Sequence, residues 1–151
     1  MKSKIVAVTF AISLGALALD AAAQAKPEVL VKQRQAAMTL QAKYLGPLGA
    51  MAQGKAPYDA AVVQRNAGYL EVLSKMPWDG FAESTKGEKS AALPAIWEKP
   101  GEFKQAAERF ENEAAKLAQV SKSGDEGAVK AQIGATAKAC GGCHENFRQK
   151  N

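Results

Sequence analysis

The sequence predicts an all-α protein, an antiparallel up-and-down bundle of four helices. Four segments repeat apolar residues at the spacings of three and four that mark one face of a helix. No segment alternates apolar and polar residues as a half-buried strand does, and no Asn-Gly pair signals a hairpin. Two connections between the four segments are short and the middle one is long, which suits antiparallel neighbours around a shared core.

Residues 1–25 form a separate unit that we expect to be a secretory signal peptide. Lys2 and Lys4 precede the apolar run IVAVTFAISLGALAL, and the small residues AAAQA follow it. A basic start, a short apolar run and a small-residue cleavage site are the three parts of such a peptide. We therefore expect export of the chain and predict that it resides in the periplasm.

Cleavage is expected after Ala23 or Ala25, and the site Ala23-Gln24-Ala25 makes Ala25 the preferred end. An uncleaved membrane anchor is the alternative. Asp20 interrupts the apolar run, which is too short for a span, and no cluster of stop-transfer charges follows. The remaining residues 26–151 are enough for one domain with a core of its own.

The first helix is predicted for residues 27–51. Pro27 suits the first position of a helix, and Gly46-Pro47 is expected to weaken or kink its last turns. The expected apolar stripe consists of Leu30, Val31, Gln35, Ala37, Met38, Leu40, Tyr44 and Leu48.

The second helix is predicted for residues 58–76, between the break QGKAP and Pro77, which stops it. Asp59 is its expected N-cap. The apolar face recurs at helical spacing and consists of Val63, Ala67, Leu70 and Leu73.

Residues 78–99 form a long connection whose middle is loop-like, because Gly, Ser, Lys and Glu prevail there. A connection of this length in a small domain is unusual and often functional. Its ends carry the apolar side chains of Trp78, Phe81, Ile96 and Trp97. These side chains either fix the loop over an apolar site or close the end of the helical core.

The third helix is predicted for residues 102–122 and the fourth for residues 126–149, with Asp125 as the N-cap of the fourth. The third has the most regular apolar face, made of Phe103, Ala106, Phe110, Ala114, Leu117 and Val120. The buried side of the fourth is expected to consist of Val129, Ile133, Ala137, Cys140 and either His144 or Phe147.

Near the end of the fourth helix, the letters CGGCH bring together both cysteines and the only histidine. Cys-x-x-Cys-His is the attachment signature of haem c. Residues three and four apart share a helix face. Cys140 and Cys143 can therefore each form a thioether with one vinyl group of a porphyrin, while His144 reaches the iron. Gly141 and Gly142 keep bulk away from the ring. One motif and one histidine predict one covalent haem c per chain.

Three other interpretations of the motif are weaker. A disulfide between Cys140 and Cys143 would close a loop too short to stabilise the fold. A thioredoxin-like redox site needs a βαβ unit, and a structural zinc site needs four ligands. The chain is predicted to be helical throughout, and the motif offers three ligands. Haem c attachment also suits an exported protein.

The opposite face of the iron needs a ligand from upstream or none, because His144 lies seven residues from the C-terminus. Without a second histidine, the candidates are Met38, Met51 and Met76. Met38 lies on the apolar stripe of the first helix, where it would fill the core, bind the iron, or act as a steric gate over a vacant position. An open position opposite a single histidine can bind small neutral gases.

These features together resemble cytochrome c′, the class II c-type cytochromes. The resemblance covers the whole mature chain. It rests on KQRQAAMTL in the first helix, GKAPYDA in the first loop, LSKMPW at the end of the second helix, IWEKPGEFK at the start of the third, and CGGCHENFRQK at the haem segment. It implies a four-helix bundle with covalently attached haem c.

The resemblance also implies roles for side chains around the iron. Cys140 and Cys143 would be the thioether residues, and His144 would be the proximal ligand. Arg148 matches a basic residue beside the proximal histidine, where it could polarise that pocket or bond a ligand there. A solvated helix face is the alternative for Arg148.

On the other side of the haem, Arg34 and Gln35 match first-helix positions that contact the haem and its propionates. A solvated helix face is again the alternative for Arg34. Met38 matches the residue above the vacant distal position. Trp78 and Phe81 would help to close the haem edge.

The long loop of the family also contributes a polar contact, often from an acidic residue. The stretch KSAALP has alanine at that place. Glu88 or Ser90 is the expected substitute.

The function implied is that of a monohaem cytochrome with high-spin, five-coordinate iron, active in electron transfer. Binding and sequestration of nitric oxide or carbon monoxide at the vacant position is the alternative. We expect no enzymatic activity, because the only histidine is committed to the metal and no acid–base groups accompany it. The family commonly forms dimers through its first two helices, so a homodimer is expected, together with a redox partner that the sequence does not identify.

The charge of the chain excludes one class of partner. The net charge is +5, or +4 once the signal segment is removed, and it is spread along the chain. No run of Lys and Arg and no aromatic ladder supports nucleic-acid binding. After the signal segment, no apolar stretch is long enough to span a bilayer.

Overall fold

The structure, a computed structural model, describes residues 25–150. The predicted signal segment lies outside the described residues, apart from Ala25. Four long helices make up most of the fold: α1 (Pro27–Ala52), α2 (Ala60–Leu73), α4 (Pro100–Val120) and α5 (Glu126–Phe147). Among the described residues no β-strand forms, so the predicted all-α class is confirmed. The long connection contains three shorter elements, η1 (Trp78–Phe81), η2 (Glu83–Thr85) and α3 (Ala95–Glu98).

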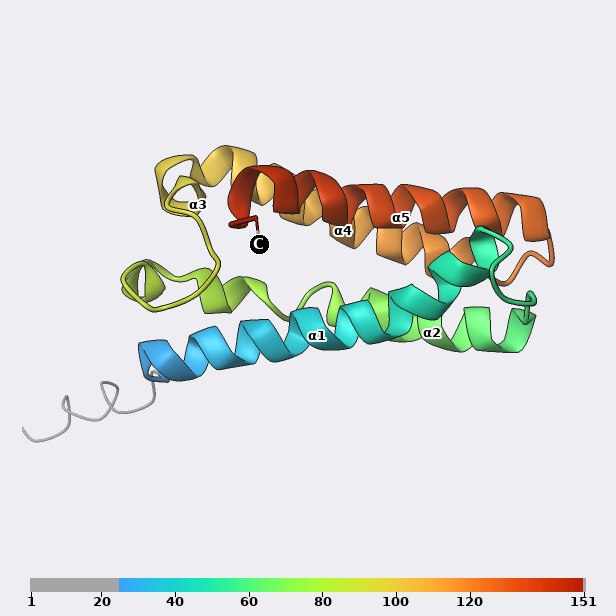
Figure 1. Cartoon of the computed structure of the whole chain (residues 1–151), viewed down its shortest axis with the longest axis horizontal. Helices are drawn as coiled ribbons and strands as arrows, with labels where there is room; N and C mark the ends of the chain where they lie inside the picture. Colours follow the sequence, from blue (N-terminus) through green and yellow to red (C-terminus); the bar gives the residue numbers. More distant parts are fainter. Residues whose placement is uncertain (1–24, 151) are drawn as a thin grey trace, which may run out of the picture.

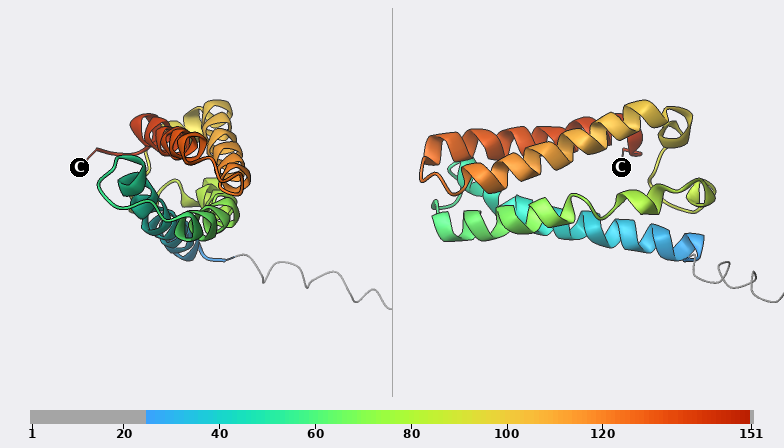
Figure 2. Two further views of the ribbon diagram at one scale, coloured as in Figure 1. Left: turned by 90° about the vertical axis from the view of Figure 1, so that its right-hand side faces the viewer. Right: turned by 180° about the vertical axis from the view of Figure 1, so that it is seen from behind.

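The four long helices form an antiparallel bundle of two layers. Helices α1 and α2 lie side by side in one layer, and α4 and α5 lie in the other (Figure 1). Across the layers, α2 contacts α4 and α1 contacts α5. The end-on view shows this arrangement (Figure 2). Both short turns lie at one end, and the long connection and the C-terminus lie at the other (Figure 1).

The helix boundaries follow the predicted start signals. Helix α1 begins at Pro27 and continues through Pro47, which lies inside the helix. Asp59 caps α2, because its carboxylate accepts a hydrogen bond from the N–H of Val62 at 3.0 Å. Asp125 caps α5 in the same way, accepting from the N–H of Ala128 at 2.9 Å.

Other boundaries differ from the prediction. Helix α2 ends at Leu73, three residues early, and α5 ends at Phe147, two residues early. Helix α4 begins at Pro100, a residue that favours the first turn. The short helix α3 was not predicted, because its four residues are too few to show a repeating apolar pattern.

The main core lies at the end of the bundle that carries the short turns. It combines the C-terminal ends of α1 and α4 with the N-terminal parts of α2 and α5, as antiparallel packing requires. The buried residues of this main core are Leu48, Met51, Val63, Ala67, Leu70, Leu117, Ala118, Val129 and Ile133. Toward the end with the long connection, a smaller cluster consists of Phe110, Ala114 and Ala139. Six further buried apolar residues among those described lie outside both clusters, so the continuous cluster of nine has no counterpart of that size toward the long connection.

The predicted face of α2 is confirmed, but two other faces need correction. In α5, Ala137 is exposed, and of the two alternatives His144 and Phe147 only Phe147 is buried. The buried side consists of Val129, Gln132, Ile133, Thr136, Ala139 and Phe147. The prediction missed Gln132 and Thr136 because both are polar. They are buried because Gln132 Nε2 and Thr136 Oγ1 each donate to the backbone oxygen of Glu113, at 3.2 Å.

In α1, the predicted stripe included Gln35 and Leu40, and both are exposed. Arg34 and Gln41 are buried in their place. Gln41 Nε2 donates to the backbone oxygen of Leu73 at 2.8 Å, which satisfies the buried amide. Polar residues with such specific partners escape a prediction based on apolar periodicity. None of the helices among residues 25–150 has the length and apolar character needed to cross a membrane.

Candidate haem site

The Cys-x-x-Cys-His motif lies in the last turns of α5. Cys140 and Cys143 are half-buried free thiols three residues apart, so their side chains lie on one side of the helix. His144 follows directly and is exposed. The helix ends three residues later, where the N–H of Arg148 donates to the His144 carbonyl at 3.2 Å. The motif is thus held in regular helical geometry up to its last residue.

The two thiols are held in their neutral form. Burial raises the pKa of Cys140 to about 11, and the neighbouring Cys143 adds to this rise. Burial also raises the pKa of Cys143. Neither thiol is therefore a ready thiolate near neutral pH, which argues against a thioredoxin-like role that depends on a lowered thiol pKa.

The imidazole of His144 is biased toward its neutral form. Although the residue as a whole is exposed, partial burial of its ring lowers its pKa, and the positive charge of Arg148 lowers it further. A neutral imidazole keeps a lone pair on one ring nitrogen, which is the form that binds a metal ion. Arg148 is itself exposed. This agrees with the alternative that its side chain is solvated.

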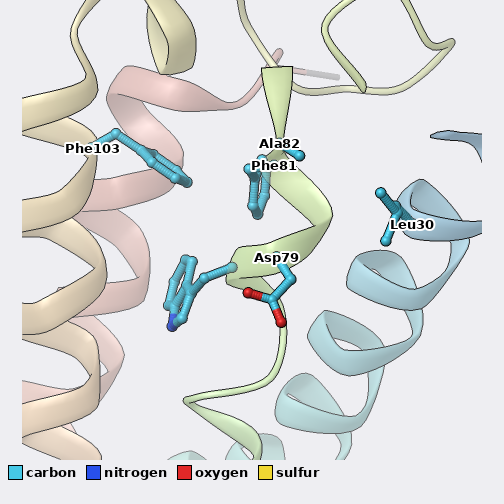
Figure 3. A pocket seen from close by; sticks show the side chains of 6 residues that line it. Leu30, Asp79, Phe81, Ala82 and Phe103 are labelled. Carbon is cyan, nitrogen blue, oxygen red and sulfur yellow. The ribbon is translucent and has the colours of Figure 1, made fainter. Parts of the chain in front are cut away.

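A hollow of about 430 Å³ lies between the long connection and the flanking helices. Its lining is mostly apolar and consists of Leu30, Trp78, Asp79, Phe81, Ala82 and Phe103. Figure 3 shows Phe81 between Phe103 of α4 and Leu30 of α1. Trp78 and Cys140 pack against the same small cluster of Phe110, Ala114 and Ala139, so the hollow adjoins the cysteine motif.

Aromatic contacts join this hollow to the end of α5. The ring centroid of Phe103 lies 4.9 Å from that of Phe81 and 5.3 Å from that of Phe147, both in edge-to-face geometry. A second hollow, of about 480 Å³, lies between α1 and α5 and contains none of the predicted site residues. It is lined by Ala42, Leu45, Gly46, Gly49, Ala50, Gln53, Lys55 and Ala137.

Arg34 is the polar centre of the site. Only 3% of its surface is exposed, so the solvated alternative is wrong. Its Nη1 donates to the carbonyl of Gly80 and to Thr85 Oγ1 (3.1 Å), and its Nη2 donates to Ser90 Oγ at 2.9 Å. The guanidinium also lies over the Phe81 ring, 4.4 Å from its centre. These contacts fasten the long connection to α1.

The residues present fit a haem. Among the described residues, no carboxylate pairs with the buried Arg34 cation. An anionic group such as a porphyrin propionate would balance this charge. Trp78 Nε1 is buried without a hydrogen-bond partner in the described chain, and it too can donate to such a group. Burial of Arg34 lowers its pKa, and a nearby anion would favour the charged form.

The donor set also fits a porphyrin better than a bare metal ion. Within residues 25–150, no group of three or more His, Cys, Asp or Glu side chains could hold a metal. One histidine with two thiols that remain neutral needs the other ligands of the iron to come from a macrocycle.

The structure brings some of the predicted site residues to the hollow and leaves others away from it. Trp78 lines the hollow, Cys140 packs beside it, and Arg34 contacts Phe81 of its wall. Met38 is half-buried one turn beyond Arg34 on α1. Gln35 is exposed, so the structure does not bring it to the hollow.

The other two candidate methionines lie elsewhere. Met51 belongs to the main core at the turn end, and Met76 is 56% exposed. Sequence reasoning had not assigned Leu30 or Phe103 to the site. Both were predicted as apolar helix positions, and the pattern alone does not say which part of an apolar face lines a hollow.

Comparison with known proteins gives a consistent result. The sequence profile of the cytochrome c′ family matches residues 29–148. Cytochrome c′ of Rubrivivax gelatinosus is 43% identical over 126 residues, which cover 83% of this chain and 98% of that protein.

Solved structures agree. Cytochrome c prime from Shewanella frigidimarina superposes with a TM-score of 0.81 at 35% identity, covering 84% of this chain and 99% of that one. A nitric oxide complex of a variant of cytochrome c prime from Alcaligenes xylosoxidans superposes with a TM-score of 0.78 at 38% identity, over 85% and 99% of the two chains. A carbon monoxide complex of another variant of that protein gives 0.77.

Proposed function

Because this chain belongs to the cytochrome c′ family, we propose that it is an exported monohaem cytochrome with high-spin, five-coordinate iron that takes part in electron transfer. The cofactor of the family, and of this chain, is haem c. The observation that carries the proposal is the position of the chain's only histidine. His144 directly follows two neutral thiols on α5, and the first of these, Cys140, packs with Trp78 against the cluster that adjoins the apolar hollow. The buried Arg34, which has no carboxylate partner among the described residues, lies over a wall of the same hollow.

The cysteines would hold the cofactor. Addition of each S–H across a vinyl group forms a carbon–sulfur bond at one carbon and places the hydrogen on the other, so no oxidant or reductant is needed. Cys140 and Cys143 would supply these two thioethers, and His144 would supply its neutral imidazole as the axial ligand. When bound, haem supplies an iron that changes reversibly between ferric and ferrous states.

Arg34 would hold the opposite edge of the cofactor. Its guanidinium is fixed by three hydrogen bonds to the long connection, so it would meet a propionate without loss of further side-chain freedom. Trp78, with its unpaired Nε1–H, and Phe81 would close the edge of the site. Gln35 stays a proposed contact from the family resemblance, although its side chain is exposed in this structure.

The distal face would be left without a strong ligand. Met51 is packed in the main core and Met76 is on the surface, which leaves Met38 as the methionine near the site. A half-buried thioether one turn from Arg34 suits a side chain that covers a vacant position. This arrangement supports five-coordinate iron and a gating role for Met38.

Gas binding is the second candidate function, and a specific observation favours it. Variants of the relative from Alcaligenes xylosoxidans form complexes with nitric oxide and carbon monoxide. A vacant distal position in this chain would accept the same small neutral ligands. Sequestration of such gases would then accompany or replace electron transfer. We propose no enzymatic activity, since the only histidine is assigned to the iron.

The surface of α1 and α2 supports the expected homodimer. Exposed apolar side chains lie on α1, on α2 and just beyond the end of α2: Leu40, Tyr69, Val72 and Met76. A two-fold axis would place two such faces together and bury them. We also propose that residues 1–25 are a signal peptide and that the chain resides in the periplasm, because haem c is attached to exported chains.

The test is an optical and electron paramagnetic resonance spectrum of the purified holoprotein, ferric and ferrous. High-spin signals in both oxidation states are expected. A low-spin spectrum with a methionine–iron charge-transfer band would contradict the five-coordinate assignment. Rapid electron exchange with a partner that slows when surface lysines are neutralised would favour electron transfer over sequestration.

A further inference from the structure

A short segment of the long connection pairs with the residues that follow His144. Residues 90–93, here named the strap, lie antiparallel to the end of α5 through a bridge between Ala92 and Arg148. The N–H of Leu93 donates to the Phe147 carbonyl at 3.0 Å, and the N–H of Gln149 donates to the Ala91 carbonyl at 2.8 Å. The strap thus satisfies backbone groups that a helix end would otherwise leave to water.

The other end of the strap is tied to α1 by one hydroxyl group. Ser90 Oγ accepts a hydrogen bond from Arg34 Nη2 at 2.9 Å. The same oxygen accepts from the N–H of Ala92 at 3.3 Å, which turns the strap toward α5. Ser90 therefore stands between the guanidinium of α1 and the pairing with α5.

Together, these hydrogen bonds and the backbone of the strap connect α1 to the end of α5 across the site. This path begins at Arg34, passes through Ser90 and the strap, and reaches the segment from Phe147 to Gln149. That segment is joined to His144 by the hydrogen bond from the N–H of Arg148. The path links the helix that carries Arg34 and Met38 to the residue proposed to bind the iron from the other side.

We propose that Ser90 is a positioning residue that, through the strap, fixes the end of α5 and the direction of the His144 ring relative to α1. The role of His144 as axial ligand rests on the proposed function, whereas the strap and its hydrogen bonds do not. The bonds of Arg34 to Gly80 and Thr85 do not involve Ser90, so the guanidinium should stay in place when Ser90 is changed and only the link should be lost.

Amide hydrogen exchange in the holoprotein tests the link. In Ser90→Ala, the amides of Leu93 and Gln149 should exchange roughly tenfold faster, as expected from loss of one hydrogen bond that supports a local structure. The amide of Leu70 in α2 should not change. Ser90→Thr keeps the hydroxyl and should restore slow exchange. Ser84→Ala, an exposed serine of the same loop, is the matched control and should behave as the wild type.

Resonance Raman spectra of the ferrous holoproteins test the effect on His144. The iron–histidine stretching band should shift in Ser90→Ala and return to the wild-type position in Ser90→Thr. Unchanged exchange at Leu93 and Gln149, or an unchanged band in Ser90→Ala, would overturn the proposal. A uniform rise in exchange that includes Leu70 would also overturn it, because Ser90 would then only stabilise the whole fold.

The two proposals fail in different ways. A wild-type spectrum without any iron–histidine band would overturn the assignment of His144 as axial ligand and, with it, the part of this inference that concerns the ring. The exchange measurement does not depend on that band and would still decide whether Ser90 holds the strap.

Discussion

Gly80 and Arg34 pack so closely that a Cβ on Gly80 would lie 2.6 Å from the Cβ of Arg34. The same atom would lie 2.8 Å from the carbonyl oxygen of Leu30 in the preceding turn of α1. The backbone of η1 thus rests directly on α1, which puts the Gly80 carbonyl in place to accept from Arg34. Glycine is required here for close approach of two backbones.

Replacing Gly80 by alanine should therefore lift η1 from α1. Because the contact is with backbone and the first carbon of a side chain, neither can swing away, and the free energy of unfolding should fall by about 1–3 kcal/mol. Urea denaturation of the holoprotein measures this loss. Gly87→Ala in the same loop is the control, since its Cβ would meet nothing within 4 Å. Equal stability of the two variants would refute the close-packing argument.

Met38→Ala should speed the binding of carbon monoxide to the ferrous holoprotein. If the thioether must move aside at a steric cost of about 1–3 kcal/mol, its removal should raise the association rate roughly 5- to 150-fold. Flash photolysis gives this rate directly. Met76→Ala changes an exposed methionine and should leave it unaltered. An association rate that does not respond to Met38→Ala would show that Met38 does not gate the site.

Alkylation of Cys140 in the haem-free chain should depend on folding. A pKa of about 11 leaves few thiolates at pH 8.5, where about half of ordinary thiols are ionised, so iodoacetamide should react about a hundredfold more slowly than in urea. The Cys143→Ser variant isolates this thiol. Its pKa should stay raised there, because burial is the larger cause and the charge of Cys143 the smaller. Equal rates with and without urea would contradict the shift.

Val72→Glu should separate the proposed homodimer into monomers. Val72 is 56% exposed on the outer surface of α2, which the proposed dimer would bury. An unpaired carboxylate buried there should weaken association by at least about 2 kcal/mol, or roughly 30-fold in the dissociation constant. Sedimentation velocity measures the change. Gln119→Glu on α4 adds the same charge at an exposed position away from this face. A Val72→Glu protein that remains dimeric would place the interface elsewhere.

The helices could be predicted because each carries a local signal. Pro27, Asp59 and Asp125 mark helix starts, and the repeat from Val63 to Leu73 marks a buried face. The cysteine motif likewise defines its chemistry within five residues. Each of these features depends only on residues close together in the sequence, so a single sequence is enough to predict it.

The polar contacts of the site could not be predicted in the same way. Arg34 is buried because it meets Gly80, Thr85 and Ser90, which lie 46 to 56 residues further along the chain. The pairing of the strap with α5 likewise joins residues about 55 positions apart along the chain. A pattern of neighbouring residues does not predict contacts at such a distance along the chain. Family resemblance supplied a role for Arg34 and suggested Glu88 or Ser90 as the polar contact from the loop. The bonds that join Ser90 to Arg34 and to the strap came from the structure.

Because the buried core is uneven, the stability of one end of the fold should depend on haem attachment. At the end with the short turns, nine buried apolar residues form one continuous cluster, whereas the cluster beside Cys140 at the other end has three members and adjoins a hollow. Cofactor loading would therefore supply apolar filling that the chain itself lacks there. Before loading, proteases should cut within residues 78–94 and spare α2; afterwards both should resist, which limited proteolysis of the two forms would show. A chain without haem would thus be degraded first at the long connection, so incomplete molecules would be removed by proteases.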